Sequence, residues 1–187
     1  GVIAHMKNLE IYIHIPFCVR KCEYCDFLSF PADDDAKLRY VKGLMAEMIF
    51  YGPLMKNYQV SSVYIGGGTP SSIDEQWIAA LMEGVFDCFN VLPDAEISIE
   101  CNPGTLSREK LLAYRDAGIN RLSIGLQSAN NDELKLLGRI HTFEQFVTNY
   151  EVARNVGFKN INVDLMYGLP EQSASQYMAT VNKIIRL

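Results

Sequence analysis

Residues 11–25 read Ile-Tyr-Ile-His-Ile-Pro-Phe-Cys-Val-Arg-Lys-Cys-Glu-Tyr-Cys, and this stretch decides how the chain is interpreted. Its first five residues alternate isoleucine with Tyr12 and His14, which is the period-2 pattern of a half-buried β-strand. Three cysteines follow at once, Cys18, Cys22 and Cys25, in the spacing C-x3-C-x2-C. The stretch therefore predicts a strand that leads directly into a cysteine-rich loop.

Three thiolates at this spacing are suited to an iron–sulfur cluster. A four-iron cluster held entirely by protein takes four cysteines, so three leave one iron open to the amino and carboxylate groups of a small molecule. A zinc site usually takes four paired ligands, and the nearest further candidate, His14, lies in the strand. A disulfide framework is disfavoured because the chain has 5 cysteines, an odd number, in 187 residues. Cys88 and Cys101 are expected to pack as small apolar residues.

The composition narrows the class of protein. A chain of 187 residues with 49% hydrophobic content is long enough for one well-buried domain. Its net charge of −5, with no block of lysine and arginine, argues against a nucleic-acid partner. No apolar run is long enough to span a membrane, and we expect a cytoplasmic protein, where thiols stay reduced. Residues 1–6 are interpreted as an expression-tag remnant, and residues 7–187 as the domain.

Short β-rich runs alternate with longer helical patterns along the chain. We expect strands near 9–15, 60–66, 96–101, 121–126 and 160–166, and the apolar spacing predicts helices over 38–48, 77–89 and 143–153. Capping boxes are predicted at Ser72-x-x-Glu75 and Thr142-x-x-Gln145. Repeated βα units indicate an α/β fold with parallel strands, right-handed crossovers and helices on the outside.

Polar side chains recur on one face of four predicted strands. Parallel strands buried on both faces normally read as continuous apolar runs, so this face is expected to line a cavity. Glu100, Gln127 and Asp164 come late in their strands, at the end where barrel active sites lie. The run Gly66–Gly68, followed by Thr69, lets backbone approach a ligand, and its exposed N–H and C=O groups are expected to grip a charged amino-acid group.

Six ordered motifs from about residue 9 to the end resemble the oxygen-independent coproporphyrinogen III oxidase family of radical S-adenosylmethionine (SAM) proteins. They are Tyr12-Ile-His-Ile-Pro-Phe-Cys18, Gly66-Gly-Gly-Thr-Pro70, Glu100-Cys-Asn-Pro103, Asn120-Arg-Leu-Ser-Ile-Gly-Leu-Gln-Ser128, Leu136-Leu-Gly-Arg-Ile-His-Thr142 and Asp164-Leu-Met-Tyr-Gly-Leu-Pro170. The resemblance implies a partial, open TIM-type (β/α)6-like barrel. Since only five strands are predicted, we expect the C-terminal part of the family fold to be absent.

The resemblance also implies roles for individual residues. Cys18, Cys22 and Cys25 would ligate a [4Fe-4S] cluster, and His14 is interpreted as structural. The implied contacts to SAM are made by Tyr12, the backbone at Tyr24, Gly67, Gly68, Thr69, Glu100, Gln127, Arg139 and Asp164. In the family, an electron from a reductant passes through the cluster and cleaves SAM reductively.

Two departures separate the branches of this family. The porphyrinogen dehydrogenase carries a further cysteine two residues after the third ligand, where this chain has Phe27, and an N-terminal extension where almost nothing precedes Leu9. Both favour the HemW-like haem-chaperone branch, with haem as a further cofactor and a haem-acceptor protein as partner. An enzyme that converts coproporphyrinogen propionates to vinyl groups stays an alternative, as does a non-radical α/β module with a structural metal site.

Overall fold

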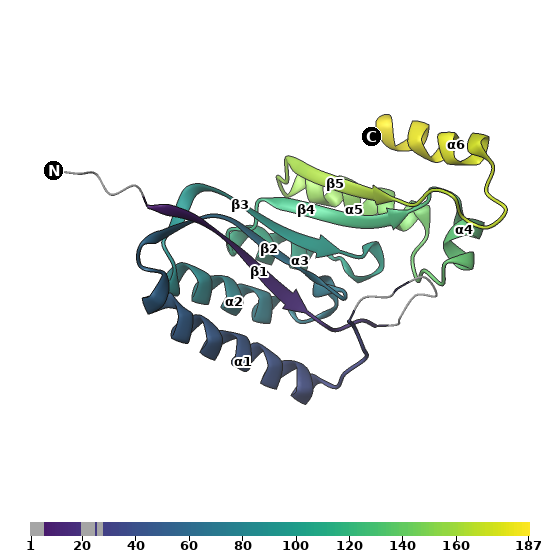
Figure 1. Cartoon of the computed structure of the whole chain (residues 1–187). Helices are drawn as coiled ribbons and strands as arrows, with labels where there is room; N and C mark the ends of the chain where they lie inside the picture. The colour runs from purple at the N-terminus through teal and green to yellow at the C-terminus, as the bar shows by residue number, and fades with distance from the viewer. Residues whose placement is uncertain (1–5, 20–24, 26–27) are drawn as a thin grey trace.

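The computed structural model describes residues 6–19, 25 and 28–187, which form one parallel sheet with helices packed against it. Its strand order, β1-β2-β3-β4-β5, follows the sequence, and every neighbouring pair is parallel. Each crossover therefore moves the chain one strand along, and all carboxyl ends meet at one edge (Figure 1). The strands are β1 Lys7–Ile15, β2 Tyr58–Gly67, β3 Val91–Cys101, β4 Arg121–Gln127 and β5 Asn160–Leu165.

Helices cover one face of this sheet. In Figure 1, α1, α2, α3 and α5 lie along that face, whereas α6 stands beyond β5. The α-helices are α1 Asp34–Tyr51, α2 Glu75–Cys88, α3 Arg108–Asp116, α4 Asn131–Leu136, α5 Phe143–Asn155 and α6 Ala174–Ile185. Short 3-10 turns η1 Gly52–Met55, η2 Pro70–Ser72 and η3 Pro103–Thr105 complete the connections.

The core lies between the sheet and these helices. The isoleucines predicted to face the helices, such as Ile15, Ile99 and Ile124, have no exposed surface. They pack in one cluster with helix residues that include Leu81 and Phe146. Burial of a side chain of this size stabilises the fold by about 1.5–3 kcal/mol. The prediction that helices cover the isoleucine side is confirmed, which leaves the polar side for the cavity.

The predicted strands and amphipathic helices are confirmed, with their ends shifted by a few residues. The capping box at Thr142 is confirmed by both of its hydrogen bonds. The one at Ser72 is wrong, because Ser72 lies in η2 and Asp74 caps α2 by accepting from the Gln76 N–H at 2.8 Å. Pro70 starts a 3-10 turn there, so α2 begins at Glu75 and not directly after Ser72.

The sheet does not close. Within the described residues, β1 and β5 each pair on one side only, so the architecture is an open half-barrel. No helix in the described part of the chain is long and apolar enough to cross a membrane. The tag interpretation of residues 1–6 and the absence of a C-terminal part stay predictions, and residues 1–5 lie outside the described ranges.

Candidate functional site

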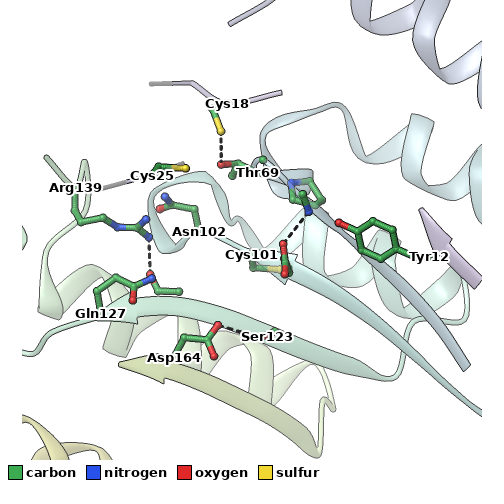
Figure 2. Close-up of a pocket in the computed structure, with 15 residues that line it drawn as sticks. Tyr12, Cys18, Cys25, Thr69, Cys101, Asn102, Ser123, Gln127, Arg139 and Asp164 are labelled. Atoms are coloured by element: carbon green, nitrogen blue, oxygen red, sulfur yellow. Dashed lines mark hydrogen bonds between the residues drawn. The ribbon is translucent and has the colours of Figure 1, made fainter. Parts of the chain in front are cut away.

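A cavity of about 270 Å³ opens at the carboxyl ends of the strands (Figure 2). Ten of the predicted site residues line it: Tyr12, Cys18, Cys25, Gly67, Gly68, Thr69, Glu100, Gln127, Arg139 and Asp164. They come from all five strands, the cysteine segment and the loop before α5. The other two, Cys22 and Tyr24, lie outside the described residues.

Phe17 and Phe30, which lie on either side of the cysteine-rich loop, form a short parallel bridge. The Cys18 N–H donates to the Phe30 carbonyl at 3.3 Å, and the Phe30 N–H donates to the Pro16 carbonyl at 2.9 Å. The Phe17 ring packs edge-on against both Phe30 and Tyr40. Both described cysteines of this loop, Cys18 and Cys25, line the cavity.

The Thr69 hydroxyl donates to the Cys18 sulfur at 3.4 Å. This bond ties the end of the glycine run to the first of the predicted cluster ligands. Within the described ranges, no group of three or more His, Cys, Asp and Glu side chains could hold a metal ion. Cys22, the predicted middle ligand, is outside those ranges.

Gly67 and Gly68 leave no room for a side chain where they contact the end of β1 and the residues that lead into the cysteine-rich loop. A Cβ on Gly68 would lie 2.6 Å from the Phe17 carbonyl oxygen, and one on Gly67, whose φ is +118°, would lie 2.7 Å from the His14 ring. The N–H groups of Gly67, Gly68 and Thr69 donate to Glu100, Ile15 and Phe17 respectively. These three N–H groups are therefore engaged within the protein, and the expectation that the glycine run grips a ligand stays a prediction.

Two carboxylates occupy the polar face of the sheet. The Glu100 Oε2 accepts from the Gly67 N–H at 3.0 Å, and its Oε1 accepts from the Tyr64 hydroxyl at 2.9 Å. The Asp164 carboxylate accepts from Ser123 at 3.3 Å and from the Asn162 amide at 2.8 Å. Each carboxylate is thus held by neighbouring protein donors, and each oxygen keeps a second lone pair for a ligand.

Arg139 and Gln127 lie together on the other side of the cavity from Tyr12 (Figure 2). The Arg139 guanidinium donates to the Gly125 carbonyl at 2.5 Å, which fastens the loop before α5 to the end of β4. Gln127 has a φ of 73°, a left-handed conformation that costs a non-glycine residue about 1–2 kcal/mol. The strand register shifts between Gly125 and Gln127, which turns the Gln127 side chain toward the cavity.

Two histidines support the cavity from outside its lining. The His14 Nε2 donates to the Leu28 carbonyl at 3.2 Å, and its Nδ1 lies 3.1 Å from the Tyr12 hydroxyl, within hydrogen-bond distance. The His141 Nε2 donates to the Leu126 carbonyl at 3.2 Å. Burial, and then the charge of Arg139, lowers the pKa of His141 to about 4. The structural interpretation of His14 is consistent with these contacts.

Sequence reasoning assigned no site role to Cys101 or Asn102, which also line the cavity. Burial raises the pKa of the Cys101 thiol, so it stays protonated, in keeping with its interpretation as an ordinary packed cysteine. Asn102 directly follows the carboxyl end of β3, and this position at the cavity edge of the sheet could have identified it as a site residue. Cys88 ends α2 and is not among the lining residues.

The family model of the radical SAM superfamily matches residues 12–184. This chain belongs to that superfamily. It is 38% identical to the haem chaperone HemW of Escherichia coli (strain K12) over 99% of the chain, and 38% identical to HemW of Bacillus subtilis (strain 168) over 94%. Those matches cover 49% and 47% of the two relatives, so the chain spans about half their length.

Solved structures agree on the fold. Coproporphyrinogen III oxidase (HemN) from Escherichia coli superposes with a TM-score of 0.89 at 32% identity, over 98% of this chain and 42% of that one. Methylornithine synthase superposes with a TM-score of 0.62 at 13% identity, over 97% of this chain and 50% of that one, which shows the fold alone. The predicted family resemblance and the open radical SAM barrel are both confirmed.

Proposed function

We propose that this chain is the cluster- and SAM-binding core of a HemW-like protein that binds haem and passes it to an acceptor. The observation that carries the proposal is the convergence of Cys18 and Cys25 with Glu100, Arg139 and Asp164 on one cavity. Similarity to proteins named haem chaperone supports the haem function.

The residues present fit a [4Fe-4S] cluster with one open iron. Cys18, Cys22 and Cys25 would hold it, and the Thr69 hydroxyl already donates to the first of these sulfurs. When bound, the cluster and SAM together supply a one-electron reductive cleavage, with the electron coming from an external reductant. The protein's part would be to bind and orient the ligand.

The charges around the cavity fit both ends of SAM. The Glu100 and Asp164 carboxylates would accept hydrogen bonds from ribose hydroxyls or an ammonium group, and the Arg139 guanidinium would bind a carboxylate. Gly67 and Gly68 would contribute close backbone approach and carbonyl oxygens, since their N–H groups are used. Tyr12, Gln127 and the backbone at Tyr24 would complete the contacts.

Anaerobic reconstitution with iron and sulfide tests the cluster. We expect a brown protein that absorbs at about 400 nm, and an electron paramagnetic resonance signal, after reduction, that changes when SAM is added. Cys22→Ala should lose the absorbance, whereas Cys88→Ala, in α2 away from the cavity, should keep it. A colourless protein that carries zinc would instead support the structural-metal module.

Haem addition separates the two functions that remain. For a chaperone, we expect a stable shift of the haem Soret band without turnover, followed by transfer to an apo-acceptor. The second candidate function, oxidation of coproporphyrinogen, is favoured by the match to HemN. Vinyl products formed from coproporphyrinogen with dithionite and SAM would contradict the chaperone assignment.

A further inference from the structure

Tyr64 lies on the polar face of β2, behind the cavity wall. Its ring stacks on that of Tyr12, with centroids 6.2 Å apart and planes 20° apart. Its hydroxyl donates to the Glu100 Oε1 at 2.9 Å. Neither the motifs nor the cavity lining include this residue, yet it touches two residues that do line the cavity.

Tyr64 and the Gly67 N–H hold opposite oxygens of one carboxylate. The Gly67 N–H reaches Oε2 at 3.0 Å while Tyr64 reaches Oε1, so rotation of the carboxylate breaks at least one bond. Gly66 leaves the space for this arrangement, because a Cβ there would lie 2.9 Å from the Tyr64 ring and 3.0 Å from the Glu100 carboxylate. The glycine run thus shapes the position of Glu100 as well as the cysteine segment.

The Tyr64 hydroxyl is a reliable donor at neutral pH. Burial, and then the neighbouring charge of Glu100, raises the pKa of Tyr64 to about 12. The titratable groups near Glu100 are Tyr12 from β1, Tyr64 from β2 and Cys101 beside it on β3. Asp164 from β5 and Arg139 from the loop before α5 line the same cavity.

We infer that Tyr64 is a positioning residue for SAM, which acts by fixing the Glu100 carboxylate in the orientation that binds the ligand. The inference rests on the proposed function and names a residue of that same site. A carboxylate held in place before binding loses less side-chain freedom when the ligand arrives, which raises affinity. Loss of the hydroxyl should therefore weaken SAM binding without affecting the cluster.

A double-mutant cycle on the reconstituted chain tests this inference. The variants are Tyr64→Phe, Glu100→Ala and the pair, with Tyr58→Phe, at the first residue of the same strand, as the matched control. The dissociation constant for SAM is measured anaerobically up to millimolar SAM, so that weak variants still give a value. Urea unfolding and cluster absorbance are recorded for every variant.

We expect Tyr64→Phe to raise the dissociation constant by about fivefold to tenfold, which corresponds to the net contribution of one typical hydrogen bond. In the Glu100→Ala background the same change should have an effect of less than about twofold, because the carboxylate that it holds is gone. Tyr58→Phe should bind SAM as the unchanged protein does.

An unchanged dissociation constant in Tyr64→Phe, or an equal loss in both backgrounds, would overturn the inference while leaving the proposed function intact. A merely structural role would produce the equal loss, accompanied by a lower urea midpoint. Absence of SAM binding in the unchanged, cluster-loaded chain would overturn the proposed function together with the inference.

Discussion

Gly68 is required at the point where the end of β2 meets the cysteine segment. An added Cβ would sit 2.6 Å from the Phe17 carbonyl oxygen, which is backbone and cannot rotate away. We expect Gly68→Ala to lower the free energy of unfolding by about 1–3 kcal/mol, as for other overpacked sites. Urea unfolding of the apo-chain would measure it.

Gly43 provides the matched control for this substitution. It lies inside α1 with nothing within 4 Å of an added Cβ. Gly43→Ala should raise the free energy of unfolding by about 0.5–1 kcal/mol, since alanine favours a helix interior over glycine. Equal effects of the two substitutions would show that the contact with Phe17 is unimportant.

His141 should make stability depend on pH. Its folded pKa of about 4 lies below the unfolded value of about 6.5, so the unfolded chain takes up the proton first. The free energy of unfolding is therefore unaffected above about pH 6.5 and falls, by at most about 3 kcal/mol, as the pH drops from there to about 4. His141→Gln keeps an N–H for the Leu126 carbonyl and does not titrate.

Urea unfolding of both proteins across pH 4–7 would check this prediction. Carboxylates also titrate in acid, so the informative quantity is the difference between the two pH profiles. We expect a shallower acid loss in His141→Gln. Parallel profiles would mean that the histidine does not contribute.

The sequence predicted which side chains meet at the site but not how they are held. Alternation along the strands and positions late in them placed Glu100 and Asp164 correctly, because both signals are local. The bonds from Tyr64 to Glu100 and from His14 to the Leu28 carbonyl join residues far apart in sequence. Such pairings follow from strand order and loop path, which spacing alone does not specify.

At the scale of elements, α6 is attached through a small buried polar network in addition to the packing of Ile184 against the core. The Thr180 hydroxyl accepts from the Ala129 N–H at 3.2 Å, and Ser128 donates to the buried carboxylate of Glu133. Gln172, before the helix, donates to the same carboxylate oxygen at 3.0 Å. These bonds join α6 and the loop before it to the end of β4, beside the cavity.

Removal of the Thr180 hydroxyl should loosen α6. Thr180→Val keeps the shape but leaves the buried Ala129 N–H without its acceptor, which costs about 1–3 kcal/mol. We expect faster amide hydrogen exchange in α6 than in the unchanged protein. Thr148→Val, at an exposed position of α5, is the control and should leave exchange unchanged. Unchanged protection of α6 in Thr180→Val would show that other contacts hold the helix.

The strands were predictable because alternation and glycine-rich ends mark them clearly. The short helices α3 and α4 were not among the predicted segments. They have only 9 and 6 residues, so an apolar period repeats too few times within them to be recognised. Their positions depend on packing against the completed sheet.

At the scale of the whole molecule, the sheet formed by the described residues has one unpaired edge at β1 and another at β5. On β5 the apolar residues Ile161, Val163 and Leu165 are only half-buried. Unpaired backbone beside apolar side chains favours pairing with another strand. We expect concentration-dependent self-association, measured by analytical ultracentrifugation.

A second exposed apolar surface lies around the end of α1 and includes Phe50. The variant Phe50→Ser tests whether that surface, and not the open edge of the sheet, causes self-association. If the open edge is responsible, this variant should associate as the unchanged chain does. A monodisperse monomer at high concentration would contradict the prediction.

The left-handed backbone at Gln127 lowers the stability of the fold, whereas its side chain lines the cavity that we propose binds the ligand. Asparagine or glycine would relieve the unfavourable φ of 73°, and an engineer who selects only for heat resistance would choose one of them. Either replacement shortens or deletes the amide that lines the cavity. If Gln127 binds SAM as proposed, selection for thermal tolerance alone would favour variants that survive heating but bind SAM less tightly.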